Sequence, residues 1–235
     1  MERIVITSSF SAIVPPPALF GIESSDTVFN AENRLLEIEP PYPNSIVAYT
    51  AAKIAALNRA EEWVQNTKPA FDLIHIFPSF VYGRDDLCTE TRLFQSGTNR
   101  FPLNVALGKP DPQGIPAMPN SYNHVNDCAR VHVLALDPKV QGNQGFLVSS
   151  SGQDGMTWED TYQIVEKHFP EAAKSGILPV PNNAAYGTVA IKLDNRKTEE
   201  TFDFRHAGYE QTVVSVVGHY LELLAAESGI ANGMH

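Results

Sequence analysis

The sequence predicts an α/β fold in which parallel strands alternate with helices. Two apolar runs, at 4–7 and 71–77, have the β-branched and aromatic composition of strands buried in a doubly wound parallel sheet. Between them, the segment from Ala48 to about Asn66 is dense in alanine and has the composition of a helix. A strand, a helix and a second strand in this order predict a right-handed βαβ unit.

The first strand, Ile4–Thr7, lies at the very start of the sequence. Nothing precedes it to supply a neighbouring strand, so we expect that the chain lacks its natural beginning. Pro15–Pro17 is expected to break any regular structure, and residues 21–45 are expected to form a long connection. Pro69 ends the helix and Pro78 ends the second strand, because proline cannot continue either element.

The remaining sequence predicts further elements around an insertion. Residues 84–121 hold many Pro, Gly and Asn residues without a clear period, which predicts a loop-rich segment of the kind that is often functional. Helices are expected at 126–136, at 157–169 behind a capping box, and at 210–227, where apolar residues recur at helical spacing. A strand is expected at 145–148.

Composition excludes several classes of protein. The chain has 235 residues, 43% of them hydrophobic, which is sufficient for a sizeable core. A net charge of −10 argues against a nucleic-acid-binding protein, and no apolar run approaches the roughly 18–20 residues of a membrane span. Two cysteines, Cys88 and Cys128, favour reduced thiols and a cytoplasmic location over a disulfide framework. No histidine or acidic cluster has the spacing of a metal site.

Tyr49 and Lys53 form the first candidate catalytic pair. Four residues apart on a helix, they lie on one face, and a nearby ammonium favours the phenolate and lowers a tyrosine pKa from about 10. Such a tyrosine exchanges a proton with a substrate oxygen near neutral pH. Taken alone, the pair also fits an exposed i,i+4 contact.

The hydroxyl run Thr7–Ser9 gives that pair a context. It follows a parallel strand, and ligands of open α/β sheets bind outside the carboxyl ends of the strands. A hydroxyl at this edge would hydrogen-bond the oxygen that Tyr49 protonates. The same hydroxyls also suit the cap of a helix or turn, and for Thr7 both interpretations stay open.

These residues, with further segments, resemble the extended short-chain dehydrogenase/reductases, within the NAD-dependent epimerase/dehydratase group. They are most similar to the dihydroflavonol-reductase-like branch, which includes fungal carbonyl reductases. The resemblance implies the C-terminal part of a Rossmann-like sheet with a small α+β substrate-binding lobe. The similar segments occur in the family's order: Ile4–Ser9, Ala48–Lys53, Pro78–Gly83, Tyr122–Ala129, Met156–Asp160 and Leu193–Lys197.

The resemblance implies a role for each matching residue. Ser9 would orient the carbonyl, Tyr49 would donate the proton, and Lys53 would lower the tyrosine pKa and hold the nicotinamide ribose. The cofactor would be NADP, with NAD not excluded, and the hydride chemistry would belong to it. The residues implied to contact this cofactor are Thr7, Tyr49, Lys53, Pro78 and Val81.

One large departure from the family concerns the phosphates of the cofactor. The family's Gly-x-x-Gly-x-x-Gly turn, whose amides hold the pyrophosphate, is not found in these 235 residues. Since a βαβ unit takes roughly 30 residues, we expect about 100 residues of the cofactor-binding part to be missing. The strand at 4–7 would then have an open edge through which the chain self-associates.

The predicted organisation has two parts. Residues 1–83 and 122–150 form the partial Rossmann-like core, and residues 84–121 and 151–235 form the substrate lobe. Apolar side chains in the insertion favour an apolar or aromatic ketone, aldehyde or alcohol as substrate: Phe94, Phe101, Leu103, Val105, Ile115 and Met118.

Two alternatives stay open at this point. A nucleotide-sugar epimerase or dehydratase would need a basic pocket, for which the candidates are Arg84, Arg92, Arg100 and Lys109. A truncated, catalytically silent member of the family would explain why the glycine-rich turn is not found.

Overall fold

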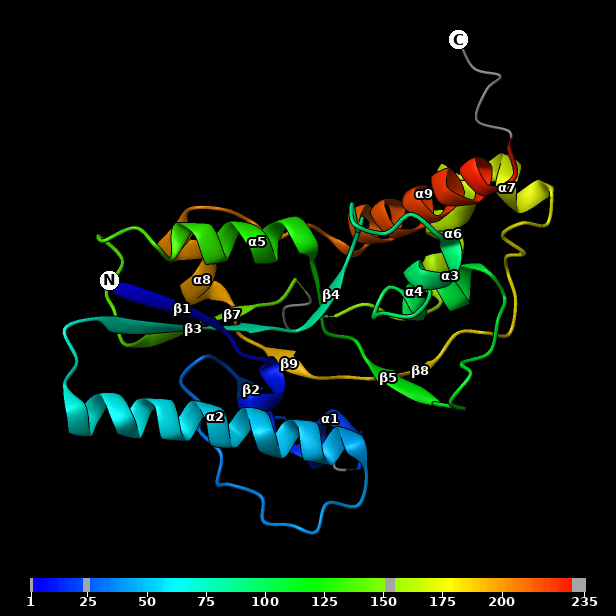
Figure 1. Ribbon diagram of the computed structural model, residues 1–235. Coiled ribbons are helices and arrows are strands. Elements are labelled where there is room, and N and C mark those ends of the chain that lie inside the picture. Colours follow the sequence, from blue (N-terminus) through cyan, green and yellow to red (C-terminus); the bar gives the residue numbers. More distant parts are fainter. Residues whose placement is uncertain (1, 23–25, 151–154, 230–235) are drawn as a thin grey trace.

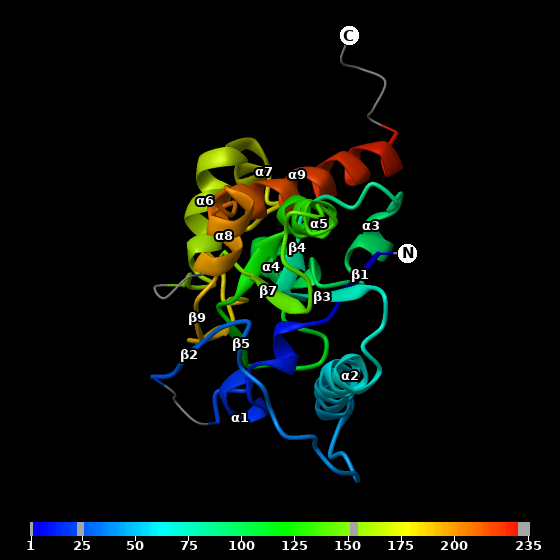
Figure 2. The same ribbon diagram turned by 90° about the vertical axis from the view of Figure 1, so that its left-hand side faces the viewer.

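The central feature is a parallel sheet of three strands with helices on both faces (Figure 1). The computed structural model describes residues 2–22, 26–150 and 155–229. The strands lie in the order β1 (Arg3–Thr7), β3 (Asp72–Pro78), β7 (Gln144–Val148), and both pairings are parallel. Helix α2 (Ser45–Thr67) lies on one face and α5 (Val125–Leu134) on the other (Figures 1 and 2). The predicted α/β class and the order of strand, helix and strand are therefore confirmed.

Helix α2 begins three residues earlier than predicted, because Asn44 caps it. The Asn44 side-chain oxygen accepts from the amides of Ile46 and Val47 at 3.0 and 2.9 Å. The helix ends at Thr67, and the capping residue Lys68 has a left-handed backbone (φ 47°) just before Pro69. Its buried side chains pack toward the sheet at helical spacing: Thr50, Ala51, Ile54 and Leu57.

The two predicted strands differ in burial. The central strand β3 is buried along almost its whole length. The first strand, β1, is half-buried, and Thr7 at its end is exposed, so its expected burial on both faces is wrong for this chain. The reason is its position: within the described residues β1 pairs only with β3 and forms the edge of the sheet.

The proline run does not prevent regular structure. A single helical turn, α1 (Pro16–Leu19), begins inside it, because the first turn of a helix needs no amide donor from proline. The connection at 21–45 also contains a short strand, β2 (Val28–Phe29), which pairs with β9 (Lys192–Leu193). This pairing joins two segments that lie far apart in the sequence.

The insertion at 84–121 is more regular than predicted. It contains α3 (Thr91–Phe94), α4 (Arg100–Ala106) and β5 (Ala117–Pro119), and every residue of α4 after Arg100 is buried. β5 pairs with β8 (Gly187–Val189). Just outside the insertion, β4 (Phe80–Tyr82) pairs with β6 (Tyr122–His124).

The lobe packs its own helices around a separate core. The apolar cluster there is centred on Trp158, which is fully buried, and includes side chains of α4 and α9. At the predicted capping box the Thr157 amide donates to the Asp160 carboxylate at 2.8 Å, but the helix begins only at Asp160. The remaining elements are η1 (Phe10–Ala12), α6 (Asp160–His168), α7 (Pro170–Lys174), α8 (Arg196–Phe202) and α9 (Tyr209–Glu227).

No helix among residues 2–22, 26–150 and 155–229 combines the length and the apolar character that a membrane crossing requires. The predicted domain boundary at residue 151 lies outside the described residues.

Candidate active site

The predicted site residues gather where β1 and β3 end. Thr7 is the last residue of β1, and Pro78 is the last residue of β3, its parallel neighbour. Ser9 follows β1 and begins η1, against which α2 packs. Tyr49 and Lys53 lie in the first half of α2. The structure therefore brings these residues to one edge of the sheet, where ligands of such folds bind.

Tyr49 and Lys53 lie on the same side of α2, as their spacing predicts. The Lys53 ammonium nitrogen is 5.7 Å from the centre of the Tyr49 ring. Tyr49 is 49% exposed, and its hydroxyl makes no hydrogen bond within the described part of the chain. The phenol is thus available to a ligand, with a cation one helical turn away.

Lys53 is oriented by the end of β1. Its ammonium donates to the backbone carbonyl of Thr7 at 3.3 Å. The Thr7 hydroxyl lies 2.8 Å from Nε2 of His132, in α5 on the other face of the sheet. No sequence pattern points to this contact of His132, because its partner is 125 residues away in the chain.

Ser9 is buried and caps η1. Its hydroxyl oxygen accepts from the amide of Ser11 at 3.2 Å and from the Ser11 hydroxyl at 2.9 Å. The capping interpretation of the hydroxyl run therefore applies to Ser9. Both bonds use the oxygen as acceptor, so the Ser9 hydroxyl proton remains free to be donated.

Pro78 and Val81 lie on either side of the step from β3 into β4. Pro78 pairs with Val148 of β7, and the Ser79 amide continues that pairing with a 3.0 Å bond to the Val148 carbonyl. Val81 is half-buried in β4, and its carbonyl accepts from the Thr98 hydroxyl at 2.5 Å. This segment is held from both sides at the carboxyl end of the central strand.

Burial makes four other tyrosines unsuitable as proton donors at neutral pH. Burial raises the pKa of Tyr122 and of Tyr186 to about 12. It raises the pKa of Tyr82 and of Tyr209 as well, and both side chains are buried in the lobe. A phenol in such surroundings keeps its proton, whereas Tyr49 is exposed at the sheet edge.

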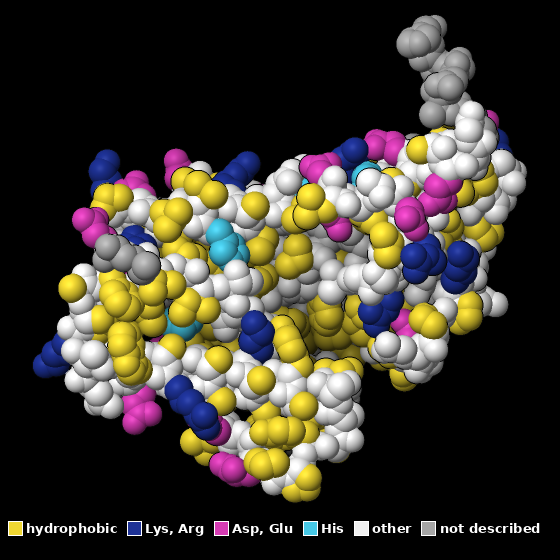
Figure 3. Space-filling view, in the orientation of Figure 1, with side chains coloured by type: hydrophobic (Ala, Val, Ile, Leu, Met, Phe, Trp, Pro, Cys, Tyr) yellow, Lys and Arg dark blue, Asp and Glu magenta, His cyan; other side chains and the backbone are white. Residues whose placement is uncertain are grey.

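The face that carries α2 is hollowed. In the space-filling view, the hollow lies between the part of the molecule that carries α2 and the lobe that carries α3 and α4 (Figure 3). Hydrophobic side chains line it (Figure 3). A ligand in this hollow would contact both the core and the lobe.

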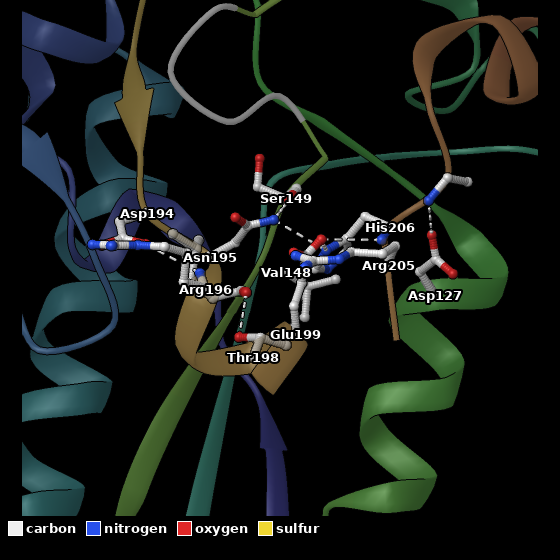
Figure 4. A network of polar contacts seen from close by, with 12 residues as sticks. Asp127, Val148, Ser149, Asp194, Asn195, Arg196, Thr198, Glu199, Arg205 and His206 are labelled. Carbon is white, nitrogen blue, oxygen red and sulfur yellow. Dashed lines mark hydrogen bonds and ion pairs between the residues drawn. The ribbon is translucent and has the colours of Figure 1, made fainter. Parts of the chain in front are cut away.

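A polar network fixes the C-terminal segment to the end of β7 (Figure 4). The Asn195 amide donates to the Ser149 carbonyl at 2.5 Å, and the Thr198 hydroxyl donates to the Leu147 carbonyl at 2.7 Å. Glu199 accepts from His206 Nδ1 at 3.0 Å, and both side chains are largely buried. Burial is the largest influence on His206 and lowers its pKa. Asn195 and Thr198 are thus structural residues that join α8 to the core.

Curated relatives of the chain include ketoreductases and NAD-dependent epimerase/dehydratases. The chain is 47% identical over 233 residues to ketoreductase CTB6 of Cercospora beticola, an alignment that covers 98% of the chain. It is 31% identical over 185 residues to the NAD-dependent epimerase/dehydratase FUM13 of Gibberella moniliformis, covering 72% of the chain and 49% of that protein. No protein-family model matches the chain.

The chain is thus similar to ketoreductases and NAD-dependent epimerase/dehydratases, as its resemblance to the extended short-chain dehydrogenase/reductases predicts. Its fold agrees with this resemblance. The crystal structure of Gre2 from Candida albicans superposes with a TM-score of 0.75 at 22% identity, covering 95% of this chain and 66% of that chain. Vestitone reductase from alfalfa superposes with a TM-score of 0.61 at 18% identity, covering 97% and 66%. The predicted resemblance and the Rossmann-type fold are therefore confirmed.

The chain is shorter than these family members. It spans 64% of the length of the Cercospora beticola ketoreductase. Catalytic and cofactor-binding roles remain predictions for six residues: Thr7, Ser9, Tyr49, Lys53, Pro78 and Val81.

Proposed function

We propose that this protein acts in the NADP-dependent reduction of a ketone or aldehyde, with Tyr49 as proton donor. The observation that carries the proposal is the exposed Tyr49 phenol, one helical turn from Lys53 and at the same sheet edge as Ser9. The 47% identity to a ketoreductase supports it.

The residues of this chain supply the proton and the orientation. A substrate carbonyl in the hollow would accept a hydrogen bond from Ser9 and a proton from the Tyr49 hydroxyl. The cofactor, when bound, supplies the hydride for the carbonyl carbon. Lys53 stabilises the phenolate left on Tyr49, and solvent then returns the proton.

The residues at the sheet edge fit the nicotinamide end of the cofactor. The Lys53 ammonium uses one hydrogen bond, to the Thr7 carbonyl, and has further N–H donors for ribose hydroxyls. Pro78 and Val81 border the same edge. A yeast relative, 22% identical, carries the name NADPH-dependent methylglyoxal reductase, which supports NADP over NAD.

The apolar side chains of the insertion were expected to line the substrate site, but most pack in the core of the lobe: Phe94, Phe101, Leu103, Val105 and Met118 are buried there. An apolar or aromatic carbonyl substrate is now supported by the hydrophobic lining of the hollow (Figure 3) and by the ketoreductase relative.

The nucleotide-sugar alternative is not favoured. The arginines predicted to bind a diphosphate contact carboxylates of the chain instead. Arg84 pairs with Asp86 and Glu222, at 2.7 and 2.5 Å. Arg92 and Arg100 lie 3.6 and 3.7 Å from Glu90 and Asp111.

The test compares two forms of the protein. One is the chain itself, and the other is a fusion that places before Met1 the stretch of the Cercospora beticola ketoreductase without a counterpart here. Each form is assayed with aromatic and aliphatic ketones and with nucleotide sugars in the presence of NADPH or NAD. Reduction of ketones that Tyr49→Phe abolishes supports the proposal. A fusion that binds NADPH but reduces no carbonyl compound supports the catalytically silent alternative.

Three further expectations belong to this proposal. Residues 1–83 and 122–150 would act as the cofactor-side core, and residues 84–121 and 151–235 as the substrate lobe. The two free cysteines, Cys88 and Cys128, support a cytoplasmic location. Self-association through the free edge of β1 is supported by the strand order, and nucleic acid is not a proposed partner.

A further inference from the structure

The end of β1 is held from both faces of the sheet. On one face, Lys53 of α2 donates to the Thr7 carbonyl at 3.3 Å. On the other, the Thr7 hydroxyl lies 2.8 Å from Nε2 of His132 in α5. Figure 1 shows α2 and α5 on opposite sides of the strands. A single residue, Thr7, therefore links the helix of the candidate proton donor to a helix that carries no predicted catalytic residue.

The direction of these hydrogen bonds follows from the surroundings of His132. Its Nδ1 atom lies 2.7 Å from the backbone carbonyl of Cys128, and a carbonyl only accepts, so Nδ1 carries a hydrogen. In the neutral imidazole Nε2 is then an acceptor, and the Thr7 hydroxyl donates to it. The Cys128 carbonyl thus fixes the ring so that its free lone pair faces Thr7.

The link matters because β1 is an edge strand. Within the described residues Thr7 has a ladder partner on one side only, Ile76 of β3. The chain then continues directly into Ser9, and the Thr7 carbonyl holds Lys53. A shift of Thr7 away from α5 would displace Ser9 and Lys53 together.

We propose that His132 is a positioning residue for the candidate active site. It holds the Thr7 side chain, so that Ser9 and the Lys53 ammonium keep their places relative to Tyr49. The inference rests on the proposed function, because it concerns the alignment of those three residues. His132 itself contacts neither Tyr49 nor Ser9 in the described structure.

The test is a double-mutant cycle, measured in whichever form of the protein reduces ketones in the assay above. Thr7→Val removes the hydroxyl but keeps a β-branched side chain, and His132→Leu removes the acceptor. Each variant should lower kcat roughly two- to fivefold, as expected for one partly exposed hydrogen bond, with little change in the KM for the ketone. The double variant should be no slower than either single variant, because both remove the same contact.

Conservative variants and a control distinguish a positioning role of His132 from a general loss of protein stability. Thr7→Ser and His132→Gln keep a hydroxyl and an oxygen acceptor, so each should restore most of kcat. Arg3→Lys weakens the opposite end of β1, where Arg3 binds Asp72 and three carbonyls near the end of α5. This control should lower the melting temperature and leave kcat near wild type.

The kcat values of these variants test the positioning role, and the activity of the wild type tests the proposed function. If the wild type reduces ketones but Thr7→Val and His132→Leu keep the wild-type kcat, or if their effects multiply in the double variant, the positioning role is wrong. A loss of kcat in Arg3→Lys equal to that in His132→Leu would also overturn it. If neither form of the wild type reduces any ketone, the proposed function fails first, and the positioning role falls with it.

Discussion

Replacing His75 should stabilise the protein, which is unusual for a residue in the central strand. His75 is 4% exposed in β3, and neither ring nitrogen has a hydrogen-bond partner within the described residues. A buried donor or acceptor without a partner costs about 1–3 kcal/mol of stability. A partly open pocket of about 200 Å³ beside it leaves room for a branched side chain and is also lined by Glu61, Val64, Gln65, Leu73 and Asn143. We therefore expect His75→Leu to raise the free energy of unfolding by about 1–3 kcal/mol near pH 7.5.

The same residue should make the wild type sensitive to acid. Burial lowers the pKa of His75 below its ordinary value of 6.5, against the smaller opposing effect of Glu61. As the pH falls through about 6.5, the unfolded chain binds a proton that the folded chain does not, so stability falls, by up to about 1.4 kcal/mol per pH unit. The stability gained by His75→Leu should thus be larger near pH 5 than near pH 7.5.

Urea denaturation followed by circular dichroism at both pH values measures these differences. His168→Leu is the matched control, since His168 is partly exposed and its contact is the surface carboxylate of Glu210. The control should change stability by less than about 0.5 kcal/mol at pH 7.5. A His75→Leu protein that is less stable than the wild type, or that gains no more near pH 5, would show that the His75 nitrogens are satisfied in solution.

Three further predictions concern function and assembly. Tyr49→Phe, in the form of the protein that reduces ketones, should lower turnover by about 10²–10⁴-fold and leave NADPH affinity nearly unchanged, because only the acidic proton is lost. Near-normal turnover in this variant would show that Tyr49 is not the proton donor. The 235-residue chain alone should bind NADPH weakly or not at all, since its sequence has no glycine-rich turn for the pyrophosphate. Micromolar binding in a calorimetric titration would contradict this expectation. Light scattering should detect self-association, because the edge of β1 is unpaired within the described residues; a monodisperse species of 25.8 kDa would argue against it.

Local patterns were sufficient for the main elements of the core. The runs at 4–7 and 71–77 were recognised by their β-branched and aromatic residues, and the helix between them by its alanine content. The cap at Asn44 was visible in the sequence but was not used, so the start of α2 was placed three residues late. The turn α1 was missed because proline was taken only as a breaker, although it suits the first turn of a helix.

The insertion shows where local patterns fail. Helix α4 is buried from Phe101 to Ala106, so most of its sequence is apolar and shows no amphipathic helical period. The short strands β2 and β5 each pair with a segment more than 65 residues away, and two or three residues carry too little signal by themselves. Their formation depends on partners that only the folded chain brings into contact.

The sequence by itself was sufficient for the fold class, the resemblance to a family and the choice of candidate catalytic residues. Spacing alone was sufficient to place Tyr49 and Lys53 on one face of a helix. Only the tertiary structure decided that the apolar side chains of the insertion fill the lobe's own core and that His132 holds Thr7. These contacts join residues through three-dimensional packing, and the Thr7–His132 contact spans 125 positions of the chain, so no local pattern encodes it.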